Sequence, residues 1–176
     1  DYTGKSIELA LLTYIRTFKN VMLLANKTAI DLLTLSHHSI DPQDRYKPST
    51  CIGAYVFDQK HKKVETIFAK ETILATGGIG QLYVHTTNPK GARGDGIAMA
   101  HRAGVRIINL EYIQFHPTTL YSAHSVNRFL ISEALRGQGA KLINKNGKSF
   151  MQIYHKLAEL APRDVVSRAI HSEMLK

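Results

Sequence analysis

The chain has 176 residues, of which 44% are hydrophobic and 21% are charged, and its formal net charge is +9. This composition excludes a disordered chain, because so much apolar surface favours a packed core. No apolar run approaches the roughly 20 residues that cross a bilayer, and the chain opens without a signal sequence. We therefore expect a soluble, cytoplasmic protein without a membrane partner. Its single cysteine, Cys51, excludes an internal disulfide and is expected to pack within a strand.

The positive charge favours anionic partners, which include nucleic acids and small molecules that carry phosphates or carboxylates. The basic residues are scattered, and only Lys60, Lys62 and Lys63 form a tight group. No nucleic-acid-binding motif accompanies this group, which falls in a predicted hairpin turn. We therefore interpret it as a solvated turn and expect no nucleic-acid partner.

The first part of the chain alternates a predicted helix with short apolar runs. Helical spacing of apolar residues predicts an amphipathic helix over residues 6–18. Apolar runs at residues 21–24 and 29–33 predict extended chain, and residues 36–50 read as a surface loop with two prolines. β-rich runs over residues 52–57 and 64–68, separated by polar residues, predict an antiparallel hairpin.

A glycine turn follows the next predicted strand. Residues 72–75 predict a short buried strand that leads into Gly77 and Gly78, where the backbone can turn sharply or approach a ligand. Further along, Asp95 is a candidate N-cap of a helix that Gly104 ends. A strand followed by a glycine turn and a helix start is typical of a cofactor-binding edge.

The last part of the chain also combines a predicted strand with a predicted helix. Apolar and aromatic runs cover residues 107–115 and 130–135, and the first of them is expected to be a strand. Pro162 then opens a final helix through about Met174, since proline is tolerated in the first helical turn. The order of elements therefore predicts a mixed α/β (α+β) fold.

Three features in this part of the chain suit a bound dinucleotide. The first is the turn of Thr76, Gly77 and Gly78. The Thr86–Pro89 segment is the second, and Asp95, which lies between two glycines, is the third. Together they supply backbone N–H groups, hydroxyls and one carboxylate, which are the groups that bind phosphates and ribose. A purely structural turn and helix cap is the alternative interpretation.

Four further residues are candidates for substrate chemistry. His116 precedes a proline and can hydrogen-bond a carboxylate, and Ser132 with Glu133 adds a hydroxyl and a carboxylate. Arg163 offers a planar fork to a carboxylate and, beside reacting atoms, could relay a proton. Each of two residues also has a purely structural interpretation. His116 would be a buried histidine that hydrogen-bonds within the core, and Arg163 would be an arginine at the start of a helix that pairs with Asp164.

The sequence lacks the motifs of a serine hydrolase and of a metal site. Ser132, His116 and Glu133 include the residue types of a serine hydrolase, but no G-x-S-x-G elbow surrounds the serine. The nine histidines include no H-E-x-x-H pattern, and one cysteine cannot form a cluster, so we expect no metal site.

Taken as one series, the motifs resemble the flavoprotein family of succinate dehydrogenases, fumarate reductases and L-aspartate oxidases. The series consists of Ala75-Thr76-Gly77-Gly78, Thr86-Thr87-Asn88-Pro89, Gly94-Asp95-Gly96-Ile97-Ala98-Met99-Ala100, Gln114-Phe115-His116-Pro117-Thr118, Glu133-Ala134-Leu135-Arg136-Gly137 and Arg163-Asp164-Val165-Val166-Ser167-Arg168-Ala169. Three segments resemble the L-aspartate oxidase branch more closely: Asn109-Leu110-Glu111, Ser132-Glu133-Ala134-Leu135-Arg136-Gly137 and Glu159-Leu160-Ala161-Pro162-Arg163-Asp164. The chain departs from the family at Ser132, where threonine is usual, and at Gln138, where glutamate is usual.

The resemblance implies an FAD-dependent enzyme that oxidises L-aspartate to iminoaspartate by hydride transfer to flavin N5. Oxygen or fumarate would reoxidise the flavin, and the product would feed quinolinate and NAD synthesis, with quinolinate synthase as a partner. A succinate dehydrogenase or fumarate reductase flavoprotein subunit is the enzymatic alternative. A truncated, non-catalytic flavoprotein domain is the alternative of another class.

The resemblance also assigns roles to residues. Those expected near the cofactor are Thr28 and Ala29, on the adenine side of FAD, and Thr76, Gly77, Gly78 and Asp95. His116, Ser132 and Glu133 would face the dicarboxylate substrate, and Arg163 would manage the proton.

The resemblance further implies an incomplete enzyme. The family's amino-terminal G-x-G-x-x-G turn is absent, as is a later segment that supplies another histidine and arginine to the substrate. We therefore expect an internal fragment that alone binds FAD poorly and is inactive. Residues 1–107 would be part of a Rossmann-like FAD-binding domain with a β-hairpin insertion, and residues 108–176 part of an α+β capping domain.

Overall fold

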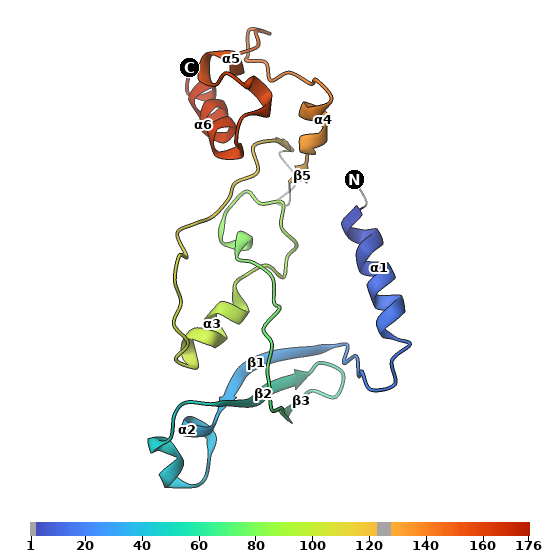
Figure 1. Cartoon of the computed structure of the whole chain (residues 1–176), viewed down its shortest axis with the longest axis vertical. Coiled ribbons are helices and arrows are strands. Elements are labelled where there is room, and N and C mark those ends of the chain that lie inside the picture. The colour runs from blue at the N-terminus through green and yellow to red at the C-terminus, as the bar shows by residue number, and fades with distance from the viewer. Residues whose placement is uncertain (1–2, 123–127) are drawn as a thin grey trace. The chain divides into compact units, whose positions relative to one another are not determined.

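The computed structural model describes residues 3–122 and 128–176, which divide into two compact units (Figure 1). Unit 1 consists of Asp1–Gly77 and Gly94–Ile107, and unit 2 consists of Gly78–Arg93 and Ile108–Lys176. Both units combine helices with antiparallel strands or short extended segments, so the mixed α/β class is confirmed. The functional division at residue 107 stays a prediction.

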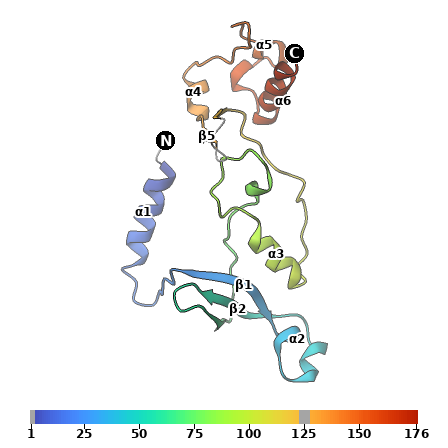
Figure 2. The same ribbon diagram turned by 180° about the vertical axis from the view of Figure 1, so that it is seen from behind.

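Unit 1 is built on a three-stranded antiparallel sheet with the order β1-β2-β3. Its strands are β1 (Lys27–Thr34), β2 (Cys51–Asp58) and β3 (Lys63–Phe68), which confirms the predicted hairpin. β1 and β2 run side by side in both views (Figures 1 and 2). Gly53 is required in β2, because its φ is +146° and a Cβ there would lie 2.0 Å from the carbonyl oxygen of Ile67.

The helices of unit 1 differ in detail from the expected ones. Helix α1 (Thr3–Ile15) starts and ends three residues earlier than predicted, and none of its residues is buried. The expected loop over residues 36–50 contains two short helices, α2 (Leu35–His38) and η1 (Pro42–Tyr46).

The N-cap predicted for the next helix was wrong. Helix α3 (Asp95–Arg102) is capped by Gly94, and Asp95 is its first residue. Gly94 has a φ of 81°, in the left-handed region that favours glycine. Asp95 still places negative charge beside the positive end of the helix dipole.

Three expected extended segments form no strand. Residues 21–24, 72–75 and 107–115 lie outside the named strands, and residues 72–75 are exposed rather than buried. Ile73, for example, is 88% exposed. A strand needs a neighbour to accept its backbone hydrogen bonds, and in the described part of the chain none pairs with these segments.

Unit 2 has a small core under its last helix. Met151 and Val166 are fully buried, and Phe150, Ala161 and Ala169 pack with them. The elements of this unit are η2 (Gly80–Leu82), β4 (Thr119–Leu120), β5 (Phe129–Leu130), α4 (Glu133–Gly137), α5 (Met151–Tyr154), η3 (Ala158–Leu160) and α6 (Arg163–Met174). Pro162 directly precedes α6, so the predicted final helix is confirmed. Across residues 3–122 and 128–176, no helix has the length and apolar character that crossing a bilayer requires.

A buried carboxylate closes the β2–β3 hairpin. The Asp58 side chain is 4% exposed, and its Oδ2 lies 2.6 Å from His61 Nδ1 and 2.7 Å from Lys27 Nζ. The backbone N–H groups of Lys60 and His61 donate to Oδ1. The hydrogen bond with His61, followed by that from Lys27, holds the pKa of Asp58 well below its ordinary value, although burial opposes the shift.

We expect Asp58→Asn to destabilise the protein near neutral pH and to do so less in acid. A depressed folded-state pKa contributes stability above about pH 4, the pKa of an unfolded aspartate, and this is lost as the pH falls toward the folded-state value. Urea unfolding of both proteins between pH 7 and pH 2 tests this, with Glu8→Gln on exposed α1 as the control. A difference that stays constant over this range would contradict the prediction.

Candidate functional site

Unit 2 brings Arg163 and Glu133 together, although they are 30 residues apart. Arg163 begins α6 and Glu133 begins α4. Glu133 Oε2 accepts from Arg163 Nε at 2.8 Å and lies 2.6 Å from Nη2, so two nitrogens of the guanidinium face one carboxylate oxygen. The hydrogen bond from Arg163 lowers the pKa of Glu133, while burial opposes it and the nearby charge of Arg136 adds to the lowering. Glu133 is therefore ionised at neutral pH.

Two more side chains complete this arrangement. Gln114 Oε1 accepts from Arg163 Nη1 at 3.2 Å. On the other side, Arg136 is buried and its Nη2 lies 3.8 Å from Glu133 Oε1, beyond hydrogen-bonding distance. No role was predicted for Gln114. Its position two residues before His116 was the available signal, because alternate residues of an extended segment point the same way.

His116 is partly buried and is fixed by its own turn. Its Nδ1 lies 3.0 Å from the carbonyl oxygen of Thr118 and also accepts from the backbone N–H of Thr118 at 3.3 Å, so both backbone groups of that residue hold the ring in place. Burial lowers the pKa of His116, and the charges of Arg163 and Arg136 lower it further, whereas the Thr118 carbonyl and Glu133 oppose the shift. A carboxylate at Nε2 would favour the charged ring and so would draw a proton onto that nitrogen.

Ser132 is the N-cap of α4. Its Oγ accepts from the backbone N–H of Ala134 at 3.3 Å. This bond uses an oxygen lone pair and leaves the hydroxyl hydrogen available to donate to a ligand.

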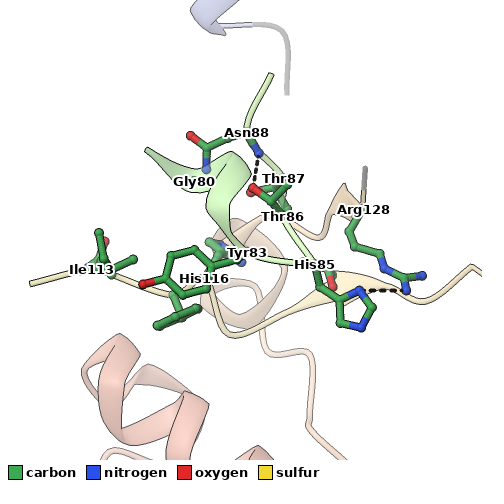
Figure 3. Close-up of a pocket in the computed structure, with 12 residues that line it drawn as sticks. Gly80, Tyr83, His85, Thr86, Thr87, Asn88, Ile113, His116 and Arg128 are labelled. Carbon is green, nitrogen blue, oxygen red and sulfur yellow. Dashed lines mark hydrogen bonds between the residues drawn. The ribbon is translucent and has the colours of Figure 1, made fainter. Parts of the chain in front are cut away.

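A cavity of about 240 Å³ lies in unit 2 beside His116 (Figure 3). Gln114 and His116 line it from one segment, and His85, Thr86 and Arg128 line it from others. Ser132, Glu133 and Arg163 are not among the lining residues. The cavity and the Arg163–Glu133 pair are therefore linked through Gln114, which contacts both.

The predicted cofactor residues of unit 1 lie on three elements. Thr76 packs against the start of α3, because a Cβ on Gly96 would lie only 1.9 Å from Thr76 Oγ1. Asp95, the residue before Gly96, is the first residue of the same helix. Thr28 and Ala29 lie on β1, which α3 contacts through the ion pair of Arg102 with Asp31 at 2.8 Å.

The glycine turn fits a bound dinucleotide. Residues 76–78 are exposed, and Gly77 has a φ of 75° with open space where a Cβ would stand. Exposed backbone N–H groups beside the N-terminus of an eight-residue helix suit a phosphate or ribose. Gly78 belongs to unit 2 and is also exposed. The described residues include no group of three or more histidine, cysteine, aspartate or glutamate side chains that could hold a metal ion.

Comparison with known proteins connects these residues to a family. The whole chain, residues 1–176, matches the family described as an FAD binding domain. It is 49% identical to L-aspartate oxidase 1 of Ralstonia nicotianae, over 100% of this chain and 32% of that protein. It is 47% identical to L-aspartate oxidase of Pseudomonas aeruginosa, over 99% of this chain and 31% of that protein. The chain thus spans about a third of the length of the curated relatives it matches.

Solved structures give a similar result. A quinol-fumarate reductase with menaquinol molecules is 29% identical with a TM-score of 0.78, over 94% of this chain and 28% of that one. Mycobacterium smegmatis Sdh1 in complex with UQ1 is 35% identical with a TM-score of 0.60, over 85% of this chain and 23% of that one.

Proposed function

The chain belongs to the FAD binding domain family, and from this premise we propose that it forms part of a flavoenzyme that oxidises L-aspartate to iminoaspartate. The relatives named L-aspartate oxidase, which match over nearly the whole chain, support this substrate. The observation that carries the proposal is the guanidinium of Arg163 held between Glu133 and Gln114, which lies two residues before His116. This arrangement can bind a carboxylate and move a proton.

Arg163 is the proposed proton carrier. FAD, when bound, supplies the acceptor for the hydride that leaves the substrate carbon. Arginine holds its proton tightly, so the oxidising direction needs a base beside it, and Glu133 at 2.6 Å is that base. The buried charge of Arg136 stabilises Glu133 as a carboxylate. Glu133 orients Arg163 and, although its lowered pKa makes it a weak base, is the proposed acceptor of the proton that Arg163 gives up as it takes the proton of the substrate.

His116 and Ser132 are the proposed carboxylate-binding groups. The Ser132 hydroxyl donates one hydrogen bond, and His116 donates another when its Nε2 is protonated. These fixed donors reduce the cost of holding a dicarboxylate in a reactive orientation.

The proposed cofactor contacts lie along the turn and helix described above. Thr28 and Ala29 are assigned to the adenine side of FAD. Thr76, Gly77, Gly78 and Asp95 are assigned to the remainder of the dinucleotide, where exposed backbone N–H groups are available. We also propose a cytoplasmic location, oxygen or fumarate as electron acceptor, and quinolinate synthase as the partner that receives iminoaspartate.

Flavin reduction tests the proposal directly. L-Aspartate or succinate is added without oxygen to the intact protein that contains this chain, and the flavin absorbance is followed. We expect aspartate to bleach the flavin. Bleaching by succinate alone would favour a succinate dehydrogenase or fumarate reductase subunit, which the TM-score of 0.78 to a quinol-fumarate reductase makes the second candidate. No bleaching in a flavin-loaded protein would favour a non-catalytic flavoprotein domain.

A further inference from the structure

Strand β1 contains a β-bulge next to the residues that are proposed to contact the adenine side of FAD. The register with β2 passes directly from Ala29 to Asp31, so Ile30 is the extra residue. Residues 28–30 are exposed, whereas residues 32–34 are buried. A bulge redirects a strand, and bulges are frequent beside active sites. This one lies where β1 passes from the core to the proposed cofactor contacts.

Arg102, the last residue of α3, binds two groups of the bulge. Its Nε donates to Asp31 Oδ2 at 2.8 Å, and its Nη2 donates to the carbonyl oxygen of Ile30 at 3.3 Å. The other carboxylate oxygen of Asp31 accepts from the backbone N–H of Leu32 at 3.0 Å, which fixes the orientation of the carboxylate. The hydrogen bond from Arg102 lowers the pKa of Asp31, although burial opposes the shift, so the pair is charged at neutral pH. One guanidinium thus ties the end of α3 to both the side chain and the backbone of the bulge.

Helix α3 connects this bulge with the glycine turn. The helix lies beside β1 in both views (Figures 1 and 2). Its first residue, Asp95, is a proposed FAD contact, and the next residue, Gly96, packs against Thr76 of the turn. An eight-residue helix is about 12 Å long, and its hydrogen-bonded backbone keeps that length. The tie at Arg102 therefore fixes the spacing between the proposed FAD contacts on β1 and those at the start of α3.

The exposure of this ion pair argues against a mainly stabilising role. The side chains of Arg102 and Asp31 are 50% and 33% exposed. Ion pairs that water and salt can reach contribute little to the stability of a fold. The effect of the pair is therefore expected in the position of β1 and α3 rather than in the free energy of unfolding.

We propose that Asp31 and Arg102 are positioning residues for FAD, which hold the bulge of β1 and the end of α3 in the arrangement that binds the cofactor. This inference goes beyond the proposed function and rests on it for the residues that contact FAD. Molecules that have lost the tie must first regain this arrangement. The apparent Kd of FAD therefore rises as the fraction of molecules in the binding arrangement falls.

FAD titration of the intact protein, stripped of its flavin and followed by flavin fluorescence, measures this Kd without turnover. We expect Arg102→Gln to raise the FAD Kd about fivefold. Arg102→Lys should give an intermediate Kd, because lysine keeps the charge but cannot serve Asp31 and the Ile30 carbonyl with a planar fork. Arg106→Gln, at another exposed arginine of unit 1, is the matched control and should leave the Kd nearly unchanged.

Asp31→Asn separates positioning from general electrostatics. FAD carries a negatively charged pyrophosphate, so the removal of a negative charge would by itself tighten its binding. Positioning predicts the opposite, a Kd that rises as in Arg102→Gln. The double variant should bind FAD no more weakly than Arg102→Gln alone, because both residues act through one contact. An FAD Kd that falls in Asp31→Asn, or that is unchanged in both single variants, would overturn the proposal.

Thermal unfolding with and without excess FAD identifies a variant that has merely lost stability. A ligand that binds only the folded protein raises the thermal midpoint, and weaker binding reduces that rise. We expect the variants at Asp31 and Arg102 to show a smaller rise with FAD and a nearly unchanged midpoint without it. Equal losses in both midpoints would indicate a structural role alone and would contradict the positioning role.

The positioning role and the proposed function fail in different ways. If neither aspartate nor succinate bleaches the flavin but the FAD Kd depends on Asp31 and Arg102, the positioning role stands and the proposed function is wrong. If aspartate bleaches the flavin and the FAD Kd is the same in both variants as in the unaltered protein, the function stands and the positioning role is wrong.

Discussion

Replacing Arg163 by leucine is expected to slow aspartate-dependent flavin reduction by about 10²–10⁴-fold, the range that positioned proton transfer contributes. Leucine removes both the proposed proton carrier and the two guanidinium nitrogens that face Glu133. Stopped-flow absorbance of the intact protein, mixed with aspartate without oxygen, measures the rate. The slower flavin reduction should persist at saturating aspartate, because the lost interaction is proposed to act in the proton transfer and not only in substrate binding.

The matched control for this variant is Arg168→Leu in the same helix. Arg168 is exposed, and its one ion pair among the described residues is with Asp164 one turn away, so its loss should leave the rate nearly unchanged. Arg163→Lys separates charge from geometry, since lysine keeps the charge but cannot present two nitrogens to Glu133. Equal rates in Arg163→Leu and Arg168→Leu, at equal flavin content, would refute the proton-carrier role.

Gly96→Ala is expected to lower the flavin content of the purified protein several-fold and to reduce its thermal midpoint. The new Cβ would lie 1.9 Å from Thr76 Oγ1, a distance that no real contact allows, so either the glycine turn or the start of α3 must move. Both belong to the proposed FAD site. The flavin absorbance relative to protein absorbance, together with thermal unfolding, measures the two effects.

A control variant and a double variant separate an effect on flavin binding from an effect on stability. Gly91→Ala is the control, because Gly91 is exposed and its Cβ would meet nothing within 4 Å. Thr76→Ala combined with Gly96→Ala removes the clashing hydroxyl and the nearby methyl group but leaves the Cβ of residue 76 at 2.9 Å, so it should restore part of the thermal midpoint. If flavin binding remains low in that double variant and in Thr76→Ala alone, the Thr76 hydroxyl itself holds the cofactor. Normal flavin content in Gly96→Ala would argue against a cofactor site at this contact.

Local sequence patterns predicted the elements that depend on near neighbours. The polar segment between two β-rich runs gave the β2–β3 hairpin, and its turn is closed by Asp58 hydrogen bonds to Lys60 and His61, two and three residues away. Helix α6 followed Pro162 as expected, because proline fixes the backbone of a first turn. The spacing of the glycine, histidine and arginine motifs identified the family before any contact was known.

The same patterns failed where a partner was needed. Residues 72–75 have strand composition but stay exposed and unpaired among the described residues, because composition does not supply a neighbouring strand. The N-cap of α3 also lies one residue before the predicted one, at Gly94 instead of Asp95. Asp95 has the preferred side chain, but the chain turns at Gly94, whose left-handed conformation an aspartate would adopt only with strain.

The sequence by itself determined the family, the mixed α/β class and the residues that carry the proposed chemistry. Only the tertiary structure decided which of them meet: Arg163 contacts Glu133 across 30 residues and Gln114 across 49. It also brought Arg128 and His85, 43 residues apart, to one cavity without a carboxylate among its described lining residues. The physical reason is that residue type and spacing set local backbone preferences, whereas contacts between distant side chains exist only once the chain has packed.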